Sequence, residues 1–122
     1  MDDRIAFGKT GEDLACRELE RRGYAILARR WRQRAGEIDI VARDGRTLVF
    51  VEVKARSGPA FGAAVEAVAY RKRQRLVQLA QFYLTINRLS NCPCRFDVVS
   101  IDLTMERPDV QVFQNAFDAG AA

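Results

Sequence analysis

The sequence contains no histidine. This absence excludes every mechanism that needs an imidazole, including Ser-His-Asp and Cys-His nucleophiles, histidine-ligated zinc hydrolases and histidine-based nucleases. Any catalysis by this chain must therefore use carboxylates, lysine, arginine, tyrosine, hydroxyls or thiols.

Cysteine is scarce as well. Cys16, Cys92 and Cys94 are odd in number and lack the C-x-x-C spacing of a metal site. The first residues lack the basic start and apolar stretch of a signal peptide, and no apolar run approaches the ~18 residues of a membrane span. We therefore expect a reduced, cytoplasmic protein that has no membrane partner.

The composition is that of an ordinary folded chain. The 122 residues are 48% hydrophobic and 30% charged, which is typical of one soluble globular domain. A chain of this length buries enough surface to fold without a disulfide or a structural metal. We expect residues 1–122 to form a single domain, with residues 118–122 as a frayed tail.

Positive charge is in excess and is carried mainly by arginine. Twenty basic residues, of which seventeen are arginine, face sixteen acidic residues, for a net charge of +4. Arginine suits phosphate oxygens, so the excess favours a nucleic-acid partner, although arginine also serves simply as a solvated surface residue. Half of the positive charge lies in residues 21–34 and 71–75. The candidate phosphate contacts there are Arg29, Arg30, Arg32, Arg34, Arg71, Lys72, Arg73 and Arg75.

Hydrophobic periodicity predicts the order α-β-β-β-α-β-β. Apolar residues recur at helical spacing up to a stop at Gly23 and again over residues 65–88, where Asn91-Cys92-Pro93 ends the second helix. Strand patterns cover residues 24–31, 37–41, 47–54, 95–101 and 110–113, and Asp44-Gly45 is a hairpin signal. This order predicts an α/β or α+β layer in which helices pack on a mixed sheet.

The strongest chemical signal lies in two neighbouring predicted strands. Because side chains alternate along a strand, Glu37 and Asp39 project to one face of the first strand. For the same reason, Glu52 and Lys54 project together from the second. If the turn at residues 44–45 pairs these strands, Asp39 lies opposite Glu52.

Two carboxylates held side by side repel each other unless a cation lies between them. Mg²⁺ or Mn²⁺ needs one or two carboxylates, with water and phosphate oxygens in its other positions. Asp39 and Glu52 are therefore candidate metal ligands, and Lys54 would orient an attacking water or neutralise charge on a scissile phosphate. A solvated sheet face with cross-strand ion pairs explains the same residues, and the residues alone leave the two interpretations balanced.

Three further residues allow two interpretations each. Glu12 is either a third site carboxylate or an acid favoured near a helix start by the helix dipole. Trp31 would stack on a base, although a single tryptophan in a strand is more often a core residue. Asp97 is interpreted as a structural acid paired with Arg95 or another arginine rather than as an additional ligand.

Ordered motifs run through most of the chain. They are Gly8-x-x-Gly11-Glu12, Gly23-Tyr24, Trp31-Arg32, Gly36-Glu37-Ile38-Asp39, Phe50-Val51-Glu52-Val53-Lys54-x-Arg56 and Arg95-Phe96-Asp97-Val98-Val99. Together they resemble the YraN-like family of small bacterial proteins, over about residues 5–101. That family is similar to the PD-(D/E)XK nuclease superfamily, near the archaeal Holliday-junction resolvases.

The resemblance implies a restriction-endonuclease-like αβββαβ core. It makes Asp39 the metal-binding aspartate, and Glu52 and Lys54 the (D/E)-x-K motif. It further implies that Glu12 is the helix carboxylate and that the carbonyl of Val53 is an additional metal ligand. The usual Pro-Asp pair is absent, because isoleucine precedes Asp39.

The leading hypothesis is a Mg²⁺-dependent (or Mn²⁺-dependent) endonuclease that hydrolyses phosphodiester bonds in DNA rather than RNA. Asp39, Glu52 and Glu12 would hold the metal, Lys54 would assist the water and Glu37 would position it. The resemblance favours branched or structured DNA, and a two-fold homodimer would present two sites to two strands. The alternative is a nucleic-acid-binding module whose nuclease-like site is silent.

Overall fold

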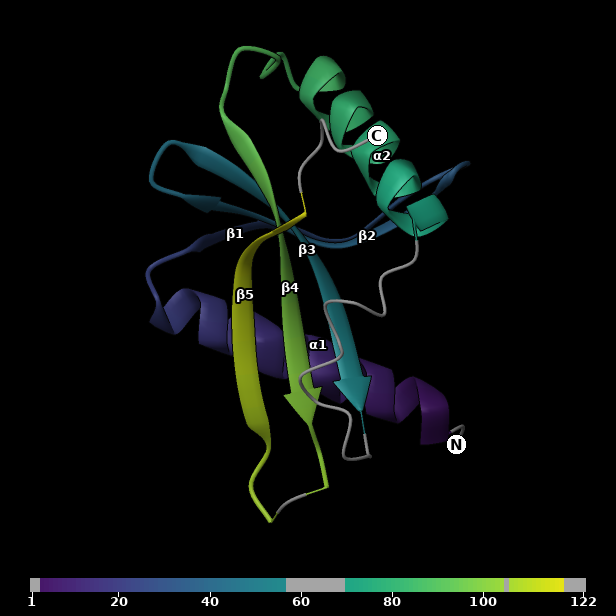
Figure 1. Cartoon of the computed structure of the whole chain (residues 1–122), viewed down its shortest axis with the longest axis vertical. Coiled ribbons are helices and arrows are strands. Elements are labelled where there is room, and N and C mark those ends of the chain that lie inside the picture. Colours follow the sequence, from purple (N-terminus) through teal and green to yellow (C-terminus); the bar gives the residue numbers. More distant parts are fainter. Residues whose placement is uncertain (1–2, 57–69, 105, 118–122) are drawn as a thin grey trace.

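The computed structural model describes residues 3–56, 70–104 and 106–117 of the chain (Figure 1). The predicted element order and the α/β class are confirmed. Residues 65–69 of the predicted second helix and the predicted frayed tail at 118–122 lie outside the described residues. The elements are α1 (Asp3–Arg21), β1 (Ala25–Gln33), β2 (Gly36–Asp44), β3 (Thr47–Arg56), α2 (Tyr70–Ile86), β4 (Cys94–Asp102) and β5 (Asp109–Phe117).

The described strands form one mixed sheet in the order β1-β2-β3-β4-β5. β1, β2 and β3 are consecutive antiparallel neighbours, β4 runs parallel to β3, and β5 returns antiparallel to β4. A parallel pair needs a crossover connection, and α2 lies in the connection between β3 and β4. This topology is that of the αβββαβ core that the family resemblance implies.

The two helices cover different faces of the sheet, and each face has its own apolar core (Figure 1). Strand alternation divides β3 between them: Val49 and Val51 pack on the α1 side, whereas Leu48 and Phe50 pack on the α2 side. The same alternation sends the next polar residue, Glu52, to the α2 side. The sequence pattern of β3 therefore decides which helix faces the acid.

The two helices end in the same backbone motif on different residues. At the end of α1, Tyr24 N–H donates to the Leu19 carbonyl at 2.9 Å, and Gly23 takes the left-handed position with φ +94°. The predicted stop at Gly23 is thus confirmed. α2 ends at Ile86, before the predicted Arg88, because Arg88 itself occupies the left-handed position with φ +57°.

Arg88→Gly is therefore expected to stabilise the protein by about 0.5–1 kcal/mol, because glycine adopts a positive φ without the steric cost of a Cβ. Urea unfolding monitored by circular dichroism measures the change. Arg88→Ala removes the same charge but keeps the Cβ, so it should give no gain. An equal gain from both substitutions would contradict the backbone explanation.

Two smaller predictions concern cysteine and membrane spans. All three cysteines are free in the structure, and their reduced state stays a prediction. Within residues 3–56, 70–104 and 106–117, no helix combines the length and apolar character that crossing a bilayer requires.

Candidate metal and phosphate site

Asp39 and Glu52 lie side by side where β2 and β3 separate. The ladder between the strands runs from Asp44 opposite Thr47 to Ile40 opposite Val51, and the two acids are the next residues of each strand. Beyond that last pair, Val53 N–H donates to Asp39 Oδ2 at 2.8 Å in place of a strand–strand bond. Asp39 is also in side-chain hydrogen-bonding contact with Glu52. The predicted juxtaposition of these carboxylates is confirmed.

The proximity of the carboxylates changes the acidity of Asp39. Burial and the negative charge of Glu52 raise the pKa of Asp39 from 3.8 to about 7, although the Val53 N–H and the Lys72 ammonium act in the opposite direction. A carboxyl with such a pKa is only partly ionised at neutral pH. The folded chain therefore keeps two acids together at an electrostatic cost, which a bound cation would relieve.

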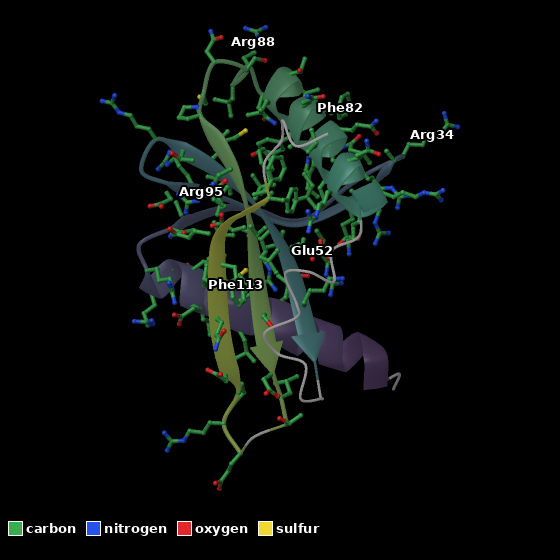
Figure 2. The ribbon with its side chains drawn as sticks, in the orientation of Figure 1. Arg34, Glu52, Phe82, Arg88, Arg95 and Phe113 are labelled. Carbon is green, nitrogen blue, oxygen red and sulfur yellow. The ribbon has the colours of Figure 1, made fainter. Side chains whose placement is uncertain are left out.

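Two lysines gather on Glu52, whose side chain is only 4% exposed. Lys54 Nζ lies 3.5 Å from Glu52 Oε1, as the alternation of β3 predicts. Lys72, from the first turn of α2, forms an ion pair with the same oxygen. Figure 2 labels Glu52 near the start of α2. The carboxylate of Glu52 therefore already attracts positively charged side chains.

The two ammonium groups differ in acidity. Burial and the neighbouring Lys72 lower the pKa of Lys54. Burial also opposes the charge of Lys72, but its contacts with Glu52 and Asp39 outweigh that effect and raise its pKa. Lys54 is therefore the lysine that releases a proton more readily, whereas Lys72 is a fixed cation.

The carboxylates open into a cavity of about 240 Å³ between the sheet and α2. Glu37 lines this cavity, and Arg32 binds its carboxylate at 3.1 Å. Gly36 has φ +145°, and a Cβ at this position would lie 3.0 Å from Cδ of Arg75, so glycine permits this close approach. The lining residues are Gly36, Glu37, Asp39, Glu52, Lys72, Arg75, Leu76 and Leu79.

Glu12 is held elsewhere. It is buried on α1, where Arg29 Nε donates to Oε1 at 3.0 Å and Arg30 Nε donates to Oε2 at 2.8 Å. In the part of the chain that the structure describes, no group of three or more Asp, Glu, Cys or His side chains is arranged to hold a metal ion. The three-carboxylate cluster predicted from the sequence is therefore not formed, because the two arginines bind Glu12 on the α1 side of the sheet.

The arginines predicted to contact phosphate are divided by the fold. Arg29 and Arg30 neutralise Glu12, and Arg32 neutralises Glu37. Arg73 lies over the Phe117 ring at 5.6 Å, whereas Arg75 lines the carboxylate cavity. Arg34 lies at the end of the β1–β2 hairpin, and the side chain of Arg71 is exposed. Only Lys72 and Arg75 of the predicted phosphate contacts line the cavity beside the acids.

The residues present fit a hard divalent cation. Asp39 and Glu52 are two touching carboxylates that offer oxygen ligands, and the backbone N–H of Val53 donates to Asp39. The carbonyl of Val53 stays a predicted ligand. The site also holds two ammonium groups that suit the phosphate oxygens of a bound substrate. Two carboxylates beside two ammonium groups would suit a divalent cation and an anionic ligand bound next to each other.

Comparison with known proteins gives a family match. The profile of the family described as "Uncharacterised protein family UPF0102" matches residues 11–101. A UPF0102 protein of Pseudomonas aeruginosa is 46% identical over 115 residues, which are 92% of each chain. A UPF0102 protein of Syntrophus aciditrophicus is 42% identical over 118 residues (97% of this chain and 93% of the relative). One of Roseiflexus castenholzii is 48% identical over 110 residues, or 89% of each chain.

Proposed function

The chain belongs to the UPF0102 family, which is the YraN family that its motifs resemble, and from its site we propose that it is a metal-dependent nuclease acting on DNA. One observation carries the proposal: Asp39 and Glu52 touch each other, beside Lys54 and Lys72, in a cavity between the sheet and α2. A phosphodiester hydrolase needs this combination of metal-binding oxygens and phosphate-binding cations.

Different residues of the chain would have different roles in the proposed reaction. Asp39, Glu52 and the carbonyl of Val53 would hold Mg²⁺ or Mn²⁺, which when bound supplies a Lewis acid and lowers the pKa of a bound water. Lys54 orients the attacking water, and its lowered pKa allows it to exchange a proton there. Glu37 lines the same cavity and positions that water from the β2 side.

The other two cationic side chains at the cavity would bind the DNA strand. Lys72 and Arg75 line the cavity and would contact the phosphates on either side of the scissile bond. Phosphate contacts do not read sequence, so the proposal is cleavage directed by the shape of the DNA rather than by a base sequence. The resolvase likeness favours branched substrates, and a two-fold dimer of this chain would offer two such sites.

The experiment is an incubation of the purified protein with branched, linear duplex and single-stranded DNA and with the matching RNAs, in Mg²⁺, Mn²⁺ or EDTA. We expect cleavage of DNA in either metal and none in EDTA, and binding that weakens steeply as salt rises. Cleavage that persists in EDTA would contradict the proposal, as would intact substrates throughout the panel.

A second candidate is a nucleic-acid-binding module with a silent site. The ion pair between Lys72 and Glu52 favours it, because a lysine that satisfies the carboxylate permanently would replace the metal. This candidate gives salt-sensitive binding of DNA without metal-dependent cleavage. It also gives no heat when Mn²⁺ is titrated into the protein.

A further inference from the structure

A second hollow adjoins the carboxylate cavity at the end of the β1–β2 hairpin. Its volume is about 230 Å³, and Leu79 lines both hollows. Gln33, Arg34 and Ala35 come from the hairpin, and Gln78, Leu79 and Phe82 come from α2. Figure 2 labels Phe82 on α2 and Arg34 at the hairpin end. The proposed nuclease chemistry does not use this second hollow.

The hollow has an exposed aromatic wall that is supported from behind. Phe82 is 48% exposed although it belongs to a helix that packs on the sheet. Its ring lies 6.0 Å from that of Trp31, and Trp31 in turn packs edge-on against Tyr83 at 5.2 Å. Trp31 is partly buried and packs against the core on the α2 side, which is closer to the second interpretation of the sequence than to an open stacking surface. It leaves the phenyl ring of Phe82 as the surface that a ligand would meet.

The polar groups around the ring are of the kind that recognise a base. Two glutamine amides, from Gln33 and Gln78, each offer a donor pair and an acceptor, which is what the edge of a nucleobase requires. Arg34 adds a cation for the backbone phosphate. An aromatic face beside amides and one cation is typical of a single-strand binding site rather than of a lipid or peptide site.

We propose that this hollow binds one unpaired nucleobase of the strand whose phosphates enter the carboxylate cavity. The base stacks on Phe82, Gln33 and Gln78 contact its edge, and Arg34 contacts its phosphate. The inference rests on the proposed nuclease function and names its substrate class. That class is DNA with single-stranded nucleotides next to the cut, as at a flap, a branch or a free strand.

The spacing of the two hollows fits this substrate. Lys72 and Phe82 are ten residues apart on α2, which is about 15 Å along the helix axis. Bases in a stacked strand follow one another every ~3.4 Å, so the hollow would hold a base about four nucleotides from the bound phosphate, and fewer in an extended strand. A base in an intact duplex is stacked and paired, and it would have to leave the helix to enter.

The test measures binding of a short fluorescein-labelled oligodeoxyadenylate in EDTA, where no cleavage occurs. Phe82→Ala is expected to weaken binding about tenfold, and Phe82→Tyr, which keeps an aromatic face, should bind like the unchanged protein. Ile86→Ala is the matched control, because Ile86 is 51% exposed one turn further along α2 and lines neither hollow. Trp31, the single tryptophan, provides a fluorescence signal for occupancy. Circular dichroism spectra confirm that each variant folds.

The outcomes separate this inference from the nuclease proposal. An oligoriboadenylate arm determines whether the hollow takes the base from DNA or from RNA, and a tenfold loss in either arm supports the base site. Equal binding by Phe82→Ala and Ile86→Ala in both arms overturns it, even if metal-dependent cleavage is present. Binding that depends on Phe82 without any cleavage would support the base site and overturn the nuclease.

Discussion

Asp39→Asn is expected to lower the rate of Mg²⁺-dependent DNA cleavage by about a hundredfold or more, while it raises the thermal stability of the metal-free protein at about pH 8. The two effects have one origin. The carboxylate that would bind the metal is the same group that repels Glu52 in the folded chain. Removal of its charge therefore removes the metal ligand and the repulsion together.

The sign of the stability effect follows from the pKa. Asp39 binds its proton more tightly in the folded chain, with a pKa of about 7, than in the unfolded chain, where the pKa is near 3.8. The cost of holding it ionised is therefore fully present above pH 7. This cost declines as the pH falls from 7 towards 3.8, and it is absent below both values. Asparagine should stabilise the fold most at about pH 8 and very little at about pH 4.

The expected gain at about pH 8 is on the order of 1–3 kcal/mol, and thermal unfolding in EDTA measures it. Asparagine keeps an oxygen that can accept the Val53 N–H bond, so the local backbone should hold. Asp109→Asn makes the same chemical change on an exposed residue of β5 and should alter neither stability nor cleavage. Loss of stability in Asp39→Asn, or undiminished cleavage, would contradict the account.

Asp97→Ala is expected to destabilise the fold by about 3 kcal/mol, with no direct effect on the carboxylate cavity. Asp97 is only 1% exposed and belongs to a polar network on the α1 side of the sheet. It accepts bonds from Arg95 Nε at 3.0 Å and from Asn115 N–H at 2.9 Å, and the Tyr24 hydroxyl donates to it at 3.4 Å. The interpretation of Asp97 as a structural acid paired with Arg95 is thus confirmed.

The expected loss of stability is large because the hydrogen-bond partners of Asp97 would remain in the fold without their acceptor. Arg95 would keep one carboxylate, Asp44 at 3.0 Å, but the buried Tyr24 hydroxyl and the part-buried Asn115 N–H would lose their acceptor. Urea unfolding measures the change in the free energy of unfolding. Asp102→Ala, which removes a partly exposed acid whose bonds to Thr104 are exposed, is the control and should cost less than about 1 kcal/mol. Equal costs for the two variants would contradict the structural role of Asp97.

The central acid pair could be predicted because its geometry is local. The two-residue turn at Gly45-Arg46 pairs Asp44 with Thr47 and so fixes the register of β2 and β3, and counting along both strands then places Asp39 opposite Glu52. Alternation along β3 likewise places Lys54 beside Glu52. Both steps depend only on residues within one hairpin, so the sequence pattern is sufficient.

The rest of the site depends on contacts between residues that are far apart in the sequence, and no local sequence pattern encodes such contacts. The docking of α2 on the sheet decides that Lys72 contacts Glu52, and the sequence interpretation assigned this lysine only to phosphate. The packing of α1 decides that Glu12 meets Arg29 and Arg30 rather than the other carboxylates. The expected burial of Glu12 is a signal that could have been used, because a buried acid with two arginines nearby usually pairs with them.

The most direct measurement is a calorimetric titration of Mn²⁺ into the metal-free protein and into Glu52→Gln, each at about pH 6 and about pH 8. We expect one ion per chain, held more tightly at the higher pH because Asp39 has then lost its proton, and no measurable binding to the glutamine variant. Absence of heat with the unchanged protein, or equal affinity in the variant, would contradict the claim that these two carboxylates form a metal site.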